Sequence, residues 1–186
     1  NEVPPGAVGE LITRGPYTIR GYYKSDEYNR LAFTPDGFYR TGDMVRLHPT
    51  GNIVVEGRKK DLINRGGEKI SPLEVEEVLA KHPEVAAAVV FAVPHPTLGE
   101  DVAAAVVLRN DSGSGVLDLR RYVAARLVGH KVPGQILIID AIPASSTGKV
   151  QRARLAQFFS DRLQAEFVEP RNVNELCLAD IWHDVL

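Results

Sequence analysis

The stretch GRKKDLINRGGEKISPLEVE, residues 57–76, contains the change of pattern that decides the fold. Before it, short apolar runs separated by turn residues predict antiparallel strands, including a hairpin of residues 44–47 and 53–56. From Asp61 onward, strands alternate with helices. This second pattern predicts an α+β subdomain.

Helix and strand signals continue on both sides of this stretch. Ser71 can cap a helix, Pro72 suits its first turn, and Glu74 can complete a capping box. A second helix is expected over 118–127, because its apolar residues recur at helical spacing. The other predicted elements are strands at 9–15, 61–70, 85–93, 101–109 and 135–140, and helices within 25–33, from about Val150 and from Asn172.

Composition excludes several classes of function. The 186 residues carry 22 Lys plus Arg against 24 Asp plus Glu, a formal charge of −2, so neither a nucleic-acid nor a membrane partner is expected. No apolar run approaches the roughly 20 residues of a membrane helix. The single Cys177 excludes an internal disulfide and fits a reducing cytoplasm. The histidines have no metal-ligand spacing, and we predict no metal site in this chain.

PASSTGKVQR, residues 143–152, invites comparison with a phosphate-binding loop. The Walker pattern fails, because Pro143 occupies the position of its first glycine and Val150 that of its hydroxyl residue. What remains is the cation of Lys149 beside a turn and ahead of a helix. From this stretch alone, a phosphate-binding lysine and a solvated lysine are about equally plausible.

Three motifs together resemble the adenylate-forming superfamily: YRTGD at 39–43, the stretch at 57–76 and PASSTGKVQR at 143–152. The general run of sequence is most similar to the enzymes that activate 2,3-dihydroxybenzoate or salicylate. The resemblance implies an α+β fold in which the end of a β-rich large ligase domain precedes a small mobile carboxy-terminal subdomain. It further implies that the phosphate loop, the Mg²⁺ ligand and the acid pocket lie upstream of Asn1.

The resemblance divides the chain into three parts. Residues 1–59 correspond to the last strands of the large adenylation domain, and residues 60–163 to the mobile subdomain. Residues 164–186 look like a linker and the first helix of a fused carrier-protein domain. In that last helix Leu178, Ile181, Trp182 and Val185 fall on one apolar face, which suggests a packing partner.

The resemblance also assigns the residues of the adenylation step. Lys149 corresponds to the mobile cation that reaches the substrate carboxylate and the α-phosphate of ATP. Asp43 corresponds to the carboxylate that accepts hydrogen bonds from both ribose hydroxyls, and Arg58 to an arginine near the ribose. Without the resemblance, Asp43 would be read as a turn residue and Arg58 as a surface arginine.

The resemblance assigns a hinge and a thiol loop as well. Lys60 matches the hinge between the two domains, where the backbone must tolerate two conformations. Arg65, Gly66 and Gly67 match the loop past which the phosphopantetheine thiol reaches the acyl-adenylate, and the glycines permit close approach of the backbone. A plain hairpin turn explains the same glycines, and both interpretations can hold.

The implied enzyme is an AMP-producing ligase that uses ATP and Mg²⁺. It would activate a carboxylic acid, expected to be aromatic, and pass it to the phosphopantetheine of a carrier protein in siderophore or non-ribosomal peptide synthesis. The fragment alone is expected to be inactive. LVGHKVP, residues 127–133, departs from the family's Leu-Pro-x-Tyr-Met-Val-Pro element in its carrier-facing details. Two alternatives stay open: a ligase that uses free CoA, and a carrier-docking module without catalysis.

Overall fold

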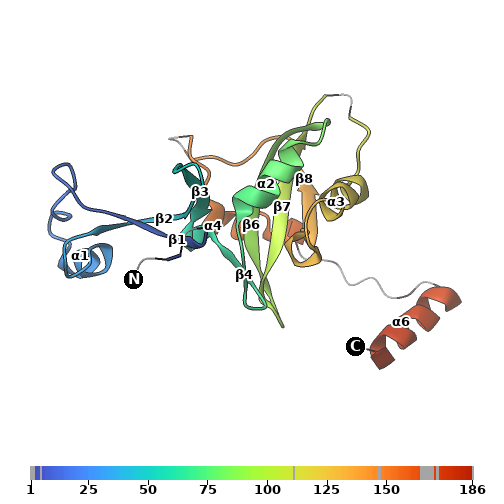
Figure 1. Ribbon diagram of the computed structural model, residues 1–186. Coiled ribbons are helices and arrows are strands. Elements are labelled where there is room, and N and C mark those ends of the chain that lie inside the picture. The colour runs from blue at the N-terminus through green and yellow to red at the C-terminus, as the bar shows by residue number, and fades with distance from the viewer. Residues whose placement is uncertain are drawn as a thin grey trace.

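The computed structural model describes residues 3–4, 6–110, 112–145, 148–163, 170 and 172–185. Among these residues the strands form two sheets, one that ends at Arg58 and one that begins at Ile63 (Figure 1). The predicted α+β class is therefore confirmed. The elements are β1 (Val8–Thr13), α1 (Asp26–Ala32), β2 (Tyr39–Leu47), β3 (Ile53–Arg58), the 3-10 helix η1 (Lys59–Asp61), β4 (Ile63–Arg65), β5 (Glu68–Ile70), α2 (Pro72–Ala80), β6 (Val85–His95), β7 (Gly99–Leu108), α3 (Val116–Ala124), the 3-10 helix η2 (Gly129–Lys131), β8 (Gln135–Ile138), α4 (Arg152–Phe158), α5 (Ser160–Leu163) and α6 (Val173–Val185).

The first sheet is antiparallel in the order β1-β2-β3. The expected hairpin is present, since Leu47 pairs with Ile53 across the turn. One face of this sheet is open to solvent, and on it Ile53 and Val55 expose 56% and 60% of their surface. Such alternation of buried and exposed positions is typical of antiparallel sheets with one open face.

The second sheet has the order β5-β4-β7-β6, and β8 joins β7 in parallel. Its two longest strands, β6 and β7, are almost continuously apolar, because helices cover both faces. In Figure 1, α2 and α3 lie on one face and α4 lies on the other. The core around α2 and α3 includes Val75, Leu79, Leu119 and Val123, while Leu155 and Phe159 close the opposite face.

Local predictions near the first stretch need correction. The capping box at Ser71 is wrong, because the Ser71 hydroxyl donates to the carbonyl of Glu56 instead of capping α2. Glu74 pairs with Lys131, with 2.7 Å between its Oε1 and the lysine Nζ. Ser71 therefore binds β3 and Glu74 binds the η2 loop, so neither side chain caps α2. The strand predicted over 61–70 is a hairpin of β4 and β5, and the second helix ends at Ala124 rather than residue 127.

Glu84, just before β6, holds the loop between β7 and α3. Its Oε2 accepts hydrogen bonds from the Ser112 hydroxyl at 2.7 Å and from the Ser114 backbone N–H at 2.8 Å. The hydrogen bonds from Ser114 and then Ser112 lower the pKa of Glu84 from its ordinary value of 4.5 to about 2. The charged form is favoured by folding, so its stabilising effect is complete above the ordinary value and disappears as pH falls toward 2.

We therefore expect Glu84→Gln to lower the melting temperature at about pH 6. The difference in melting temperature from the parent chain should become progressively smaller as the pH falls from 4.5 to 2. Thermal unfolding of both chains across this range tests it. Glu77→Gln on the exposed side of α2 is the matched control. A difference between Glu84→Gln and the parent chain that stays constant with pH would contradict the assignment.

The last helix, α6, begins where the sequence predicts. The Asn172 side-chain oxygen accepts the Glu175 N–H at 3.0 Å, which satisfies an amide at the helix start. Its apolar side chains are open to solvent, with Ile181 53% and Trp182 63% exposed. Val185 lies outside the residues whose side chains are described. None of the described helices has the length and apolar character that crossing a membrane requires.

Candidate functional site

Asp43 and Arg58 face each other across β2 and β3, where their Cα atoms are register partners. Arg58 Nε lies 2.8 Å from Asp43 Oδ1, and Arg58 Nη1 donates to the Thr41 carbonyl at 3.1 Å. The Asp43 side chain is 30% exposed and the Arg58 side chain 55% exposed, so the pair is open to solvent. A carboxylate has about four acceptor positions, and the ion pair orients it without exhausting them.

A bulge brings the rest of the fold close to this pair. The β2–β3 register shifts after Met44, and Gly57 opposite it has a φ of +136°, which favours glycine. A Cβ on Gly57 would lie 3.4 Å from the Ser71 hydroxyl. The start of α2 therefore packs directly on the end of β3.

A cavity of about 210 Å³ lies at this junction. Asp43 and Arg58 line it from the first sheet, and Arg152 lines it from the start of α4. Its remaining lining residues are Val55, Gly57, Asp61, Pro72 and Leu73. The structure thus places both predicted ribose residues beside the helix that follows Lys149.

Lys149 closes a short turn. Ser145 N–H donates to the Lys149 carbonyl at 2.9 Å, and the Ser145 hydroxyl accepts the Lys149 N–H at 3.2 Å. Gly148 completes the turn with a φ of +74°. Lys149 is exposed, and among the described residues no hydrogen bond or ion pair engages its ammonium group. An exposed cation on a long, flexible stem can reach an anion outside this chain.

Lys60 lies in η1 between two anchored neighbours. Lys59 Nζ is 3.0 Å from Glu10 Oε2 on β1, and Asp61 Oδ2 is 3.7 Å from Arg152 Nη1 on α4. One neighbour is thus tied to the first sheet and the other to the α+β subdomain. Lys60 occupies the point where the chain passes between them, and its role as a hinge stays a prediction.

The Arg65–Gly67 loop is a tight hairpin turn between β4 and β5. Gly66 and Gly67 have φ values of +58° and +96°, which is typical of a two-residue turn that matches strand twist. Gly66 N–H donates to the Leu98 carbonyl at 2.9 Å, so the turn rests on the β6–β7 turn. Both interpretations of the glycines remain compatible with this geometry.

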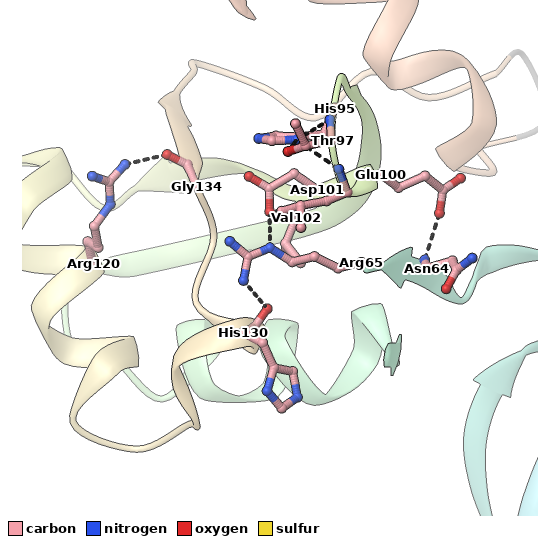
Figure 2. A network of polar contacts seen from close by, with 11 residues as sticks. Asn64, Arg65, His95, Thr97, Glu100, Asp101, Val102, Arg120, His130 and Gly134 are labelled. Carbon is pink, nitrogen blue, oxygen red and sulfur yellow. Dashed lines mark hydrogen bonds and ion pairs between the residues drawn. The ribbon is translucent and has the colours of Figure 1, made fainter. Parts of the chain in front are cut away.

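Arg65 points into the protein rather than toward solvent (Figure 2). Its Nε lies 2.6 Å from Oδ1 of Asp101, and its Nη1 donates to the His130 carbonyl at 3.2 Å. Asp101 is 9% exposed, and its Oδ1 also accepts the Val102 N–H at 2.8 Å. Arg65 therefore fixes the glycine turn relative to the η2 loop.

Gly134 makes room for this ion pair. Its N–H donates to the Val102 carbonyl at 2.9 Å, and a Cβ there would clash with Oδ2 of Asp101. Arg120 donates to the Gly134 carbonyl from the other side at 2.6 Å (Figure 2). The backbone at Gly134 is thus held on both sides.

We expect Gly134→Ala to lower the free energy of unfolding by about 1–3 kcal/mol, because a new methyl group must displace a buried, paired carboxylate. Chemical denaturation of the two chains measures the difference. Gly129→Ala in the same segment is the matched control, since a Cβ there meets nothing within 4 Å. Equal losses in the two variants would refute the clash.

The predicted residues fall into two groups. Asp43 and Arg58 line a cavity together with Arg152 at the start of α4, whereas the β4–β5 turn lies at the lower end of the second sheet in Figure 1. Motif matching missed Arg152, Asp61 and Asp101. Arg152 carried one signal, since it follows Lys149 by three residues at the start of a predicted helix. No arrangement of His, Cys, Asp and Glu among the described residues suits a metal ion.

Comparison with known proteins gives consistent results. Residues 74–149 match the family model of the AMP-binding enzyme C-terminal domain. The chain is 52% identical over 156 residues to a salicylyl-CoA synthase / salicylate adenylyltransferase from a Streptomyces species, covering 83% of this chain and 28% of that protein. It is 45% identical over 167 residues to a 2,3-dihydroxybenzoate-AMP ligase from Bacillus subtilis (strain 168), covering 89% of this chain and 31% of the ligase. The chain thus spans less than a third of the length of these relatives.

Two solved structures of one protein, MatB, superimpose on this chain to different extents. ATP-bound MatB from Rhodopseudomonas palustris superimposes with a TM-score of 0.81, and apo MatB with a TM-score of 0.65. Both matches have 30% sequence identity and cover 87% of this chain and 32% of MatB. The two matches therefore differ in TM-score, while sequence identity and coverage are the same.

Proposed function

The chain carries an AMP-binding enzyme C-terminal domain and belongs with the adenylate-forming enzymes, and from this premise we propose that it is the carboxy-terminal portion of an ATP-dependent acid:AMP ligase. The complete ligase activates a carboxylic acid, most suitably an aryl acid. It transfers the acyl group to a phosphopantetheine thiol in siderophore or non-ribosomal peptide synthesis. Its ATP requirement fits a cytoplasmic enzyme.

One observation carries the proposal: Asp43, Arg58 and the start of α4 surround the same cavity. Asp43 suits a ribose because its two carboxylate oxygens can accept both hydroxyls, and Arg58 holds it in place. A carboxylate oxygen of the acid attacks the α-phosphorus of ATP, forms the acyl-adenylate and releases pyrophosphate. Lys149 supplies fixed positive charge where negative charge gathers on the oxygens. Mg²⁺, which would neutralise the leaving pyrophosphate, is assigned to residues outside this chain.

The arrangement of the parts favours this step. MatB superimposes better in its ATP-bound form than in its apo form. We therefore assign the observed orientation, with Arg152 beside Asp43 and Arg58, to adenylate formation. Transfer then needs a second orientation about Lys60, in which the Arg65–Gly67 turn faces the acyl-adenylate. There the thiol sulfur attacks the acyl carbon, and AMP leaves.

The acceptor is a carrier protein in our proposal. The exposed apolar side chains of α6, including Ile181 and Trp182, fit a helix that packs within a further domain. We assign residues 164–186 to a linker and the first helix of that carrier domain. Free CoA is the second candidate, because a relative at 52% identity is named a salicylyl-CoA synthase.

The test uses the complete protein that contains this chain. Pyrophosphate exchange across a panel of salicylate, 2,3-dihydroxybenzoate, benzoate and aliphatic acids should show exchange with an aryl acid. Loading of a phosphopantetheinylated carrier should then exceed loading of free CoA. The 186-residue chain alone should give no exchange. Absence of exchange with every acid would refute the ligase, and preference for CoA would favour the second candidate.

A further inference from the structure

Arg152, the first residue of α4, joins three elements of the subdomain. Its Nη2 donates to Oε1 and Oε2 of Glu76 on α2, both at 2.8 Å. Its Nη1 lies 3.7 Å from Oδ2 of Asp61 in η1. A single guanidinium therefore links α4 to α2 and to the turn that contains Lys60.

This link is well shielded from water. The side chains of Arg152, Glu76 and Asp61 are 23%, 15% and 20% exposed, respectively. Glu76 Oε1 also accepts the backbone N–H of Val90 at 2.8 Å, and Val90 is fully buried in β6. The carboxylate is thereby fixed to the central sheet. Charge-assisted hydrogen bonds with such limited solvent access are stronger and more rigid than surface pairs.

The link lies between the hinge and Lys149. Asp61 follows Lys60 directly, and Arg152 follows Lys149 by three residues. Leu155 and Phe159, 2% and 5% exposed, hold α4 on the sheet beyond Arg152. The turn that carries Lys149 is thus three residues from a point anchored to the hinge side and to the sheet.

Arg152 also borders both cavities of this region. It lines the cavity that contains Asp43 and Arg58, and a second cavity of about 420 Å³ that contains Lys60. Among the described residues, Arg152 is the only cationic side chain that lines both cavities, and it also ties α4 to η1. Its position favours a role in setting where the Lys149 turn lies relative to the first sheet.

We propose that Arg152 is a positioning residue. It ties the Lys149 turn rigidly to the segment that follows the hinge residue Lys60. It does so through Glu76 and Asp61, without contact with the substrates. The consequence for catalysis rests on the proposed function: Lys149 reaches the α-phosphate only when this tie is intact. The proposal concerns adenylate formation alone, because the Arg65–Gly67 turn has its own support from Asp101.

The experiment compares Arg152→Gln, Arg152→Lys and Arg162→Gln in the complete protein. Arg162 is the matched control, because it is an arginine of α5 whose Nη2 donates to the Ile138 carbonyl at 2.8 Å. Pyrophosphate exchange, thiol loading from a synthetic aryl-adenylate, thermal stability and amide hydrogen exchange of residues 143–151 are measured for each. A general loss of stability would affect the two half-reactions together, so their ratio isolates positioning.

We expect Arg152→Gln to slow pyrophosphate exchange by about 10²-fold, the typical effect of a small displacement of a catalytic group. Thiol loading should stay within about twofold, and amide exchange of residues 143–151 should accelerate. Arg152→Lys should recover part of the rate, because it keeps the charge and loses the paired hydrogen bonds. Arg162→Gln should change neither half-reaction.

Equal slowing of the two half-reactions by Arg152→Gln, or unchanged amide exchange of residues 143–151, would overturn the inference. If the parent protein exchanges no pyrophosphate with any acid, the proposed function fails instead. The amide-exchange comparison then decides by itself whether Arg152 anchors the Lys149 turn.

Discussion

Lys149→Ala in the complete protein should slow acyl-adenylate formation by several orders of magnitude. The substitution removes a charge aimed at the oxygens of the transition state, and such electrostatic contributions are usually the largest in catalysis of this kind. Transfer of the acyl group from a supplied aryl-adenylate should remain nearly intact, because the other orientation presents the Arg65–Gly67 turn. Pyrophosphate exchange and thiol loading from synthetic adenylate measure the two steps separately.

Lys81→Ala provides the control for Lys149→Ala. Lys81 is an exposed lysine of the same subdomain, at the end of α2 and outside both groups of site residues. Its loss should change neither half-reaction. If Lys149→Ala slows both steps to the same extent, Lys149 has a general structural or binding role, and the account with two orientations is wrong.

Lys60→Pro should have the reverse effect, with thiol loading lost and adenylate formation largely kept. Proline fixes φ near −65°, within the range of a 3-10 helix, and Lys60 lies in η1. The substitution therefore suits the observed orientation, which we assign to adenylate formation, and hinders rotation to the second one. Loading should fall by at least about 10²-fold, which single-turnover measurements can resolve.

Lys60→Ala separates the backbone effect from the loss of charge. Alanine leaves φ and ψ free, so both half-reactions should proceed at close to the parent rates. If Lys60→Pro impairs pyrophosphate exchange more than thiol loading, the observed orientation does not belong to adenylate formation. If Lys60→Ala matches Lys60→Pro, the ammonium group rather than the hinge matters.

Much of the fold could be predicted from the sequence. The hairpin of β2 and β3, the apolar strands β6 and β7, and the starts of α2 and α6 follow from local pattern, because turn residues and periodic apolar positions act over a few residues. The capping box at Ser71 failed for the opposite reason. A carbonyl of β3 competes for the hydroxyl, and the distant Lys131 competes for Glu74.

The candidate site could likewise be predicted only in part from the sequence. The motifs identified Asp43, Arg58, Lys60, Lys149 and the Arg65–Gly67 turn as a family pattern. Their assigned roles stay predictions that the half-reactions must test. The pairing of Asp43 with Arg58 was within reach, since the two lie on adjacent strands of one predicted hairpin.

The sequence by itself determined the class of fold, the order of its elements and the residue types that can carry the chemistry. Only the tertiary structure decided that Arg152 binds Glu76 across 76 positions, and that Asp101 meets Arg65 beside Gly134. A charged side chain has many possible partners along a chain of this length. Sheet order and helix packing select one of them, because burial makes an unpaired charge too costly to keep.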